Sequence, residues 1–123
     1  MNLNAFKEIS TQRTDRTIHT ARVNPEHINY LVAAEPDRVG KSVLTMAAGL
    51  ASGSTLRPTD DLETLAQRFP NLTSVQIFYT ASGTHGGTGL VNMARVALIE
   101  DRGAYAVLSF IDGDSLNIVK TWP

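Results

Sequence analysis

Cysteine is absent from this chain of 123 residues, and its absence excludes several kinds of fold and site. No disulfide scaffold can form, and neither an iron–sulfur cluster, a Cys-type zinc site nor a thiol nucleophile is available. The absence also fits a reducing compartment, so we expect a cytoplasmic protein.

Long apolar runs are also missing. No stretch approaches the roughly 18 apolar residues of a membrane span, and the first ten residues, MNLNAFKEIS, lack the apolar core of a signal peptide. We therefore expect no membrane partner. With 42% hydrophobic and 19% charged residues, the composition is that of an ordinary globular chain with about one core. We expect residues 1–15 to form a lead-in and residues 16–123 a single β-rich domain.

The chain has little net charge, with 11 Lys and Arg against 12 Asp and Glu, which gives a formal charge of −1. Duplex DNA is bound by clustered cations, so this balance argues mildly against strong nucleic-acid affinity. The distribution is uneven, however. The first 22 residues carry four cations against two carboxylates: Lys7, Arg13, Arg16, Arg22, Glu8 and Asp15.

Histidines are few, and no metal-binding pattern includes them. His19, His27 and His85 show no HxH, HExxH or His-with-carboxylate spacing, so we expect no metal and no cofactor. The acidic pairs have structural explanations and require no catalytic or metal-binding role. Asp60 and Asp61 fall at the start of a predicted helix, while Glu100–Asp101 and the pair Asp112 and Asp114 flank predicted turns as solvated residues.

The stretch THGGTGLVN, Thr84 to Asn92, places a histidine among glycines. An oxyanion loop would need a GxSxG nucleophile elbow, which the chain lacks. A phosphate-binding loop would need a Walker-type phrase or a GxGxxG that opens a helix, and neither is present. The remaining readings are a DNA-contacting loop, with His85 and Thr88 as donors, and a structural surface loop whose glycines take positive φ.

Period-two alternation and runs of β-formers predict seven to nine strands. The main predicted strands are Thr17–Val23, Ile28–Glu35, Ser42–Gly49, Leu72–Thr80, Ala94–Asp101, Ala104–Ile111 and Ser115–Trp122. Residues 5–10 read as a short helix or a loose lead-in, and the phrase NPEH as a turn set by Pro25 and Asn24. Asp112–Gly113 predicts a hairpin turn. The fold class expected is mainly β, or α+β by strict count.

One principal helix is predicted at about Thr59–Phe69. Thr59 is a good N-cap, and Asp60 and Asp61 place negative charge at the positive end of the helix dipole. Four apolar residues recur at helical spacing and form a core-facing stripe: Leu62, Leu65, Ala66 and Phe69. Pro70 prevents continuation.

Two segments of the chain resemble each other at a constant offset of 68 residues. RVNPEHINYL, from Arg22, aligns with LVNMARVALI, from Leu90, and after a longer first loop VLTMAAG aligns with VLSFIDG. Each unit would consist of a Val-Asn corner, a short turn, a strand, a hairpin and a second strand. The alternative is chance agreement between two β-hairpins, because the matches are mostly apolar.

The run from Arg22 to Thr121 resembles the LytTR-type DNA-binding domain of bacterial response regulators. The phrases that carry the resemblance are HINYL for the first strand, DDLETLAQRF for the helix, HGGTGLVN for the family's HRSyLVN stretch and DGDSLNIVKTW for the last hairpin. LVNMARVALIE is the closest local match. The resemblance implies a LytTR-like arrangement of short helices and β-hairpins.

The sequence departs from the family where DNA contact is made. His85 takes the place of the family's histidine, but Gly86 and Gly87 stand where its arginine and serine would be. The terminal SRR becomes Lys120, Thr121 and Trp122. DNA binding would then be weakened or redirected toward other cations. Trp122 is expected to serve the core or an interface.

The leading functional hypothesis is a small non-enzymatic regulator of transcription that binds duplex DNA. Its expected DNA-binding residues are His85, Thr88, Asn92, Arg95 and Lys120, with Arg13, Arg16 and Arg22 as phosphate partners. The alternative is a protein-binding adaptor, an inhibitor or a self-assembling homo-oligomer on the same kind of β fold. A hydrolase or nuclease using His85 lacks a visible base–nucleophile pair, so we expect no catalytic residues.

Overall fold

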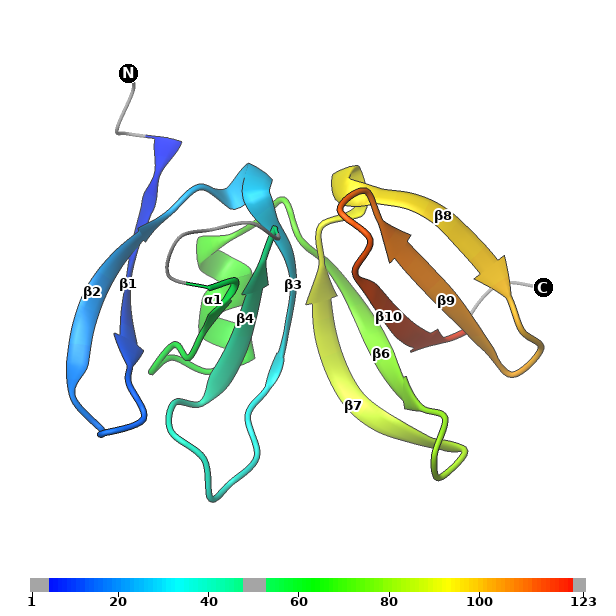
Figure 1. Ribbon diagram of the computed structural model, residues 1–123, viewed down its shortest axis with the longest axis horizontal. Helices are drawn as coiled ribbons and strands as arrows, with labels where there is room; N and C mark the ends of the chain where they lie inside the picture. Colours follow the sequence, from blue (N-terminus) through cyan, green and yellow to red (C-terminus); the bar gives the residue numbers. More distant parts are fainter. Residues whose placement is uncertain (1–4, 48–52, 121–123) are drawn as a thin grey trace.

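The computed structural model describes residues 5–47 and 53–120, and within them the chain is mainly β, as expected (Figure 1). The strands are β1 Lys7–Gln12, β2 Ile18–Val23, β3 Ile28–Ala33, β4 Ser42–Met46, β5 Thr55–Leu56, β6 Thr73–Tyr79, β7 Thr84–Val91, β8 Val96–Asp101, β9 Tyr105–Phe110 and β10 Ser115–Val119. The helical elements are α1 Leu62–Arg68 and two 3-10 turns, η2 Pro25–His27 and η3 Met93–Arg95.

The strands form an antiparallel eight-stranded sheet and a separate β1–β2 hairpin. The order in the large sheet is β5-β4-β3-β7-β6-β10-β9-β8. The hairpin joins this sheet through a bridge between Thr11 and Pro58, just beyond β5. Around the bridge, the Gln12 amide donates to the Arg57 carbonyl over 2.9 Å, and the Thr59 amide to the Ser10 carbonyl over 3.0 Å.

Two expectations about secondary structure are wrong. Residues 5–10, read as a short helix or lead-in, contain the start of β1, and Ile9 is 1% exposed in the core. Burial in β1 alternates along the strand, with Ile9 and Thr11 facing the interior. The glycine-rich stretch from Thr84 is not a loop either, because residues 84–91 form β7 and pair with both β6 and β3.

The helix α1 is shorter than expected and begins later. Its N-cap is Asp61, whose carboxylate accepts from the Thr64 amide over 2.9 Å and whose pKa that bond lowers. Thr59 instead extends the contact with β1. The apolar stripe is confirmed, since Leu65 and Phe69 are fully buried and Leu62 and Ala66 pack against them.

The internal near-repeat is a structural repeat. Asn24 accepts from the Glu26 amide before η2, and Asn92 accepts from the Ala94 amide before η3. Each 3-10 turn leads into a strand with a register shift at its second residue, Asn29 in β3 and Ala97 in β8. We call β1–β5, with residues 57–59, unit 1 and β6–β10 unit 2.

Two clusters of buried side chains form the core, one for each unit. The first contains Ile9, Val23, Ile28, Leu31, Leu44, Met46, Leu65, Phe69 and Leu90. The second contains Val91, Ala106, Leu108, Phe110 and Ile118. α1 covers the first cluster, and Tyr30 of unit 1 packs against the second.

Candidate functional site

The glycines of β7 are explained by packing around the strand. A side chain at Gly86 would lie 2.2 Å from the ring of Tyr79, and one at Gly89 would lie 2.6 Å from Ile77 Cδ1. Gly87 has a φ of +97°, in the left-handed region that favours glycine, beside a register shift in the β6–β7 pairing. The glycines therefore serve strand geometry.

The two DNA-binding residues expected on this strand lie on different parts of it. Thr88 is exposed and pairs with Gln76 on β6. The His85 backbone pairs with Phe78 near the hairpin end, while its side chain lies outside the described part of the structure. Lys120, Arg95 and Asn92 lie outside this strand, after β10, in η3 and just after β7.

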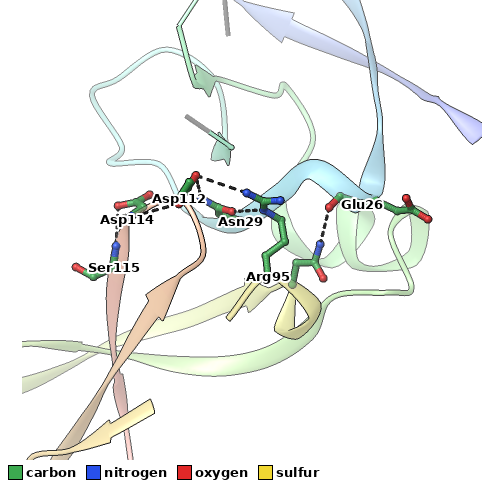
Figure 2. Close-up of polar contacts among 7 residues, drawn as sticks. Glu26, Asn29, Arg95, Asp112, Asp114 and Ser115 are labelled. Carbon is green, nitrogen blue, oxygen red and sulfur yellow. Dashed lines mark hydrogen bonds and ion pairs between the residues drawn. The ribbon is translucent and has the colours of Figure 1, made fainter. Parts of the chain in front are cut away.

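Asn92 and Arg95 are engaged within the fold, where the two corners meet (Figure 2). The Asn92 side chain is 2% exposed and donates to the Glu26 carbonyl over 3.3 Å. The Arg95 Nε donates to Asn29 Oδ1 over 2.7 Å, and its guanidinium lies 3.7 Å from Asp112 Oδ2. A direct contact with a DNA base would require either residue to give up these bonds.

Asp112 is not the solvated turn residue expected from the sequence. Its side chain is 13% exposed, that of Arg95 is 12% exposed, and Asp112 Oδ2 also accepts from Asn29 Nδ2 over 3.0 Å. Asn29 is fully buried. Asn29, Arg95 and Asp112 form the corner cluster, which joins the start of β3, the end of η3 and the β9–β10 turn (Figure 2).

Several other cations have carboxylate partners. Lys120 donates to Asp101, and this hydrogen bond holds the pKa of Asp101 below its usual range. Arg102 lies 3.4 Å from Glu100. Arg22, one of the expected phosphate partners, lies 3.8 Å from Glu8 on the surface. Exposed pairs of this kind contribute little to stability, but they reduce the local positive potential.

The strongest concentration of cations lies elsewhere, at the loop ends of unit 1. A hollow of about 520 Å³ is lined by Arg13 and Arg57, and an adjoining one of about 250 Å³ by Arg16, Arg38 and Arg57. The two hollows share Thr14 and Arg57. We call these hollows, with their four arginines, the arginine cleft.

Few carboxylates balance these arginines. Asp37 lines the second hollow, Glu35 lies 3.5 Å from Arg38 in an exposed pair, and Asp15 lies between Arg13 and Arg16 in the chain. Hydrogen bonds from Thr17, with a smaller contribution from the charge of Arg13, lower the pKa of Asp15. Within residues 5–47 and 53–120, Arg13, Arg16 and Arg57 form no ion pair with a carboxylate. The cleft therefore carries three unpaired guanidinium groups, which favour an anionic ligand.

Gln12 fixes the three segments that carry these arginines. Its backbone amide donates to the Arg57 carbonyl, its side-chain amide donates to the Arg16 carbonyl over 3.1 Å, and its Oε1 accepts from the Gly40 amide over 2.9 Å. Gly40 has a φ of +75°, and a side chain there would lie 2.8 Å from the Arg57 carbonyl oxygen. This close approach holds the β3–β4 loop against the segment after β5.

Sequence reasoning found part of this cleft and missed the rest. Arg13 and Arg16 were expected as phosphate partners, whereas Arg38, Arg57 and Gln12 were not considered. Arg38 and Arg57 lie 19 residues apart along the chain, so no local pattern connects them. The one available signal was the number of arginines in the loops of the N-terminal half.

Comparison with protein-family models, with curated proteins and with solved structures gives no significant match. In the part of the chain that the structure describes, no three His, Asp or Glu side chains lie together in a way that could hold a metal ion. Among the same residues, α1 and the two 3-10 turns are all too short to cross a membrane.

Proposed function

We propose that the protein is a small, non-enzymatic, DNA-binding regulator of transcription of the LytTR-like type, and that the arginine cleft holds the phosphate backbone. The observation that carries the proposal is the convergence of four arginines from three segments of unit 1 on adjoining hollows. Guanidinium groups bind phosphates through paired hydrogen bonds, and such contacts supply most of the affinity of a protein for duplex DNA.

The order of elements supports the same proposal. The corner, the first hairpin, α1, β7 and the last hairpin follow one another in the order of the LytTR-type pattern. The family's own basic positions correspond to Gly86, Gly87 and the end of β10, where one lysine remains. Phosphate contact is accordingly assigned to unit 1, whose cations are largely unpaired.

Fluorescence anisotropy with a mixed-sequence duplex at about 50 and about 200 mM salt tests this proposal. Four phosphate contacts would release about four counterions, so we expect the affinity to fall about 100-fold between the two salt concentrations. Absence of binding at the lower salt concentration would contradict the proposal.

Variants of the cleft give the second test. The double variant Arg13→Gln/Arg57→Gln removes two unpaired cations, so the slope of log affinity against log salt should become shallower by about 2. Arg102→Gln is the matched control, because Arg102 is an exposed arginine of unit 2 that is paired with Glu100. His85→Ala distinguishes the β6–β7 hairpin, since a loss of affinity in this variant alone would move the interface there.

A further inference from the structure

The two units share one strand order. The order is β2-β1-β5-β4-β3 in unit 1 and β7-β6-β10-β9-β8 in unit 2. In each unit a single bridge attaches the first hairpin, β1–β2 or β6–β7, to the strand that comes last in the chain, β5 or β10, or to the residues just after it. The bridges are Thr11 to Pro58 in unit 1 and Ile77 to Ile118 in unit 2. Pro58 comes two residues after Leu56, which pairs with Leu44. Ile118 likewise comes two residues after Leu116, which pairs with Leu108, so the two bridges occupy equivalent positions.

The units are joined head to tail within the chain. β3, the last strand in the order of unit 1, pairs with β7, the first strand in the order of unit 2. The pairs in this junction are Tyr30 with Val91, Leu31 with Leu90 and Val32 with Gly89. At the two ends of the molecule, β2 pairs only with β1 and β8 only with β9 among the described residues (Figure 1).

These two outer edges are the counterparts of the two strands that meet in the junction. In the internal repeat, β8 of unit 2 corresponds to β3 of unit 1, and β2 of unit 1 corresponds to β7 of unit 2. The edge of β8 is apolar, since Leu98 is 52% exposed and Ile99 is 45% exposed. Their counterparts at the junction are Tyr30, which is half-buried, and Leu31, which is fully buried. Exposed apolar edge strands are sites of pairing with another chain.

We propose that β8 of one copy of this protein pairs with β2 of a second copy, antiparallel and in the register of the β3–β7 junction. An offset of 68 residues transfers that register to three intermolecular pairs. These pairs are Leu98 with Val23, Ile99 with Arg22 and Glu100 with Ala21 of the second copy.

The side chains on the two edges fit this register. Leu98 takes the place of Tyr30, whose ring lies 5.6 Å from Phe110. The counterpart of Phe110 in unit 1 is Met46, because each is paired with the first residue of the strand that follows its corner. Leu98 therefore packs on Met46 of the second copy, a contact between two flexible apolar side chains.

The opposite face of the same pairing is electrostatically matched. Arg22 lies across from Ile99, so its aliphatic stem covers the apolar side chain. Its guanidinium, which lies 3.8 Å from Glu8 of its own copy, reaches toward the diagonal neighbour Asp101, which also binds Lys120. Ala21 stands where the junction has Gly89, and its partner within the hairpin is Ile9, as Val75 is the partner of Gly89.

Each copy has one edge of each kind, so the contact is heterologous and repeats. Closed rings form if the rotation between copies closes, and open arrays form if it does not. The proposal concerns the protein alone and is independent of DNA binding, so it is tested without nucleic acid.

Sedimentation velocity over a range of concentrations tests the proposal on the full chain. The weight-average mass should rise with concentration in the wild type and stay that of the monomer in Ile99→Lys, because a lysine would face Arg22. Ile111→Lys is the matched control, since Ile111 is a 61% exposed isoleucine in the turn after β9 and belongs to neither β8 nor β2. Association that persists in Ile99→Lys, or a wild type that is monomeric throughout, would overturn the proposal.

A charge reversal shows that the contact is intermolecular. The double variant Ile99→Lys/Arg22→Glu places opposite charges across the interface and should restore association. Thermal melts of each variant show that the change in mass is not caused by unfolding. Failure of the double variant to associate while it remains folded counts against this register.

The absence of native cysteines allows a direct test of the register. Ala21→Cys and Glu100→Cys, mixed under oxidising conditions, should form a disulfide between the two variants, and neither variant alone should form one. Cross-linking of Glu100→Cys with itself would indicate symmetric pairing of β8 with β8 and would contradict the head-to-tail contact.

Discussion

At the scale of single residues, the corner cluster explains why Arg95 and Asp112 are both present. The sequence suggested opposite roles for them, a DNA contact and a turn that repels phosphate. The structure brings them together with Asn29 in nearly buried positions. The cation and the anion, both in unit 2, neutralise each other and leave little charge for a ligand, and their hydrogen bonds with Asn29 of unit 1 connect the two units.

Replacement of one member of the cluster should be costly. Arg95→Met leaves the nearly buried Asp112 carboxylate without its cation and Asn29 Oδ1 without its donor. Breaking a buried ion pair in this way costs about 3–5 kcal/mol. Chemical denaturation measures the loss. The matched control is Arg102→Met, which breaks an exposed pair and should cost about 1 kcal/mol or less. Equal effects of the two substitutions would show that the cluster is not a stabilising contact.

The direct interaction between Arg95 and Asp112 can be measured separately from their contacts with Asn29. A double-mutant cycle between Arg95→Met and Asp112→Asn separates the direct interaction of the two charges from the penalty of stranding one of them. A coupling energy near zero would mean that Arg95 is held by Asn29 alone.

At the scale of elements, β7 illustrates how tertiary contacts override local signals. Four glycines in a stretch of seven residues predicted a loop, because glycine disfavours strands. In the structure, β7 lies between β3 and β6, and Ile77 and Tyr79 of β6 occupy the space that side chains at Gly89 and Gly86 would take.

Substitution of these two glycines should therefore have unequal effects. Gly89→Ala forces the new methyl group against buried Ile77 and to 3.2 Å from the Leu31 carbonyl oxygen, so we expect a loss of about 1–3 kcal/mol. Gly86→Ala meets only Tyr79, which is 54% exposed and can turn aside. Thermal denaturation compares the two, and a Gly86→Ala variant as unstable as Gly89→Ala would contradict this explanation.

At the scale of the whole molecule, β1 near the N-terminus is part of the fold. β1 completes unit 1 by bridging β2 to the segment after β5, and its Ile9 lies in the first core cluster. A dispensable lead-in would tolerate substitution there.

A pair of isoleucines in the same hairpin tests this point. Ile9→Ala should cost about 2–5 kcal/mol because it leaves a cavity in the core. Ile18→Ala, at a position 63% exposed on β2, should change stability by less than about 1 kcal/mol. Denaturant titration of both variants measures the difference, and similar values would indicate that β1 is only loosely attached.

Local signals predicted the elements whose cause is local. The Asn-capped corners at Asn24 and Asn92 follow from side chains that bond to the neighbouring backbone. The apolar stripe that ends at Phe69 follows from helical spacing. The turn at Asp112–Gly113 follows from the glycine, which readily adopts the φ of +94° found there. The arginine cleft could be predicted only in part, because Gln12 and Arg57 lie 45 positions apart in the chain.

The sequence by itself determined the β-rich class, the position of the helix and the internal repeat, because these depend on the alternation, spacing and capping of neighbouring residues. Tertiary structure alone decided which charges are neutralised and which strands remain at the edges. The pairing of Arg95 with Asp112, the gathering of arginines around Gln12 and the free edges of β2 and β8 all depend on contacts between segments far apart in the chain.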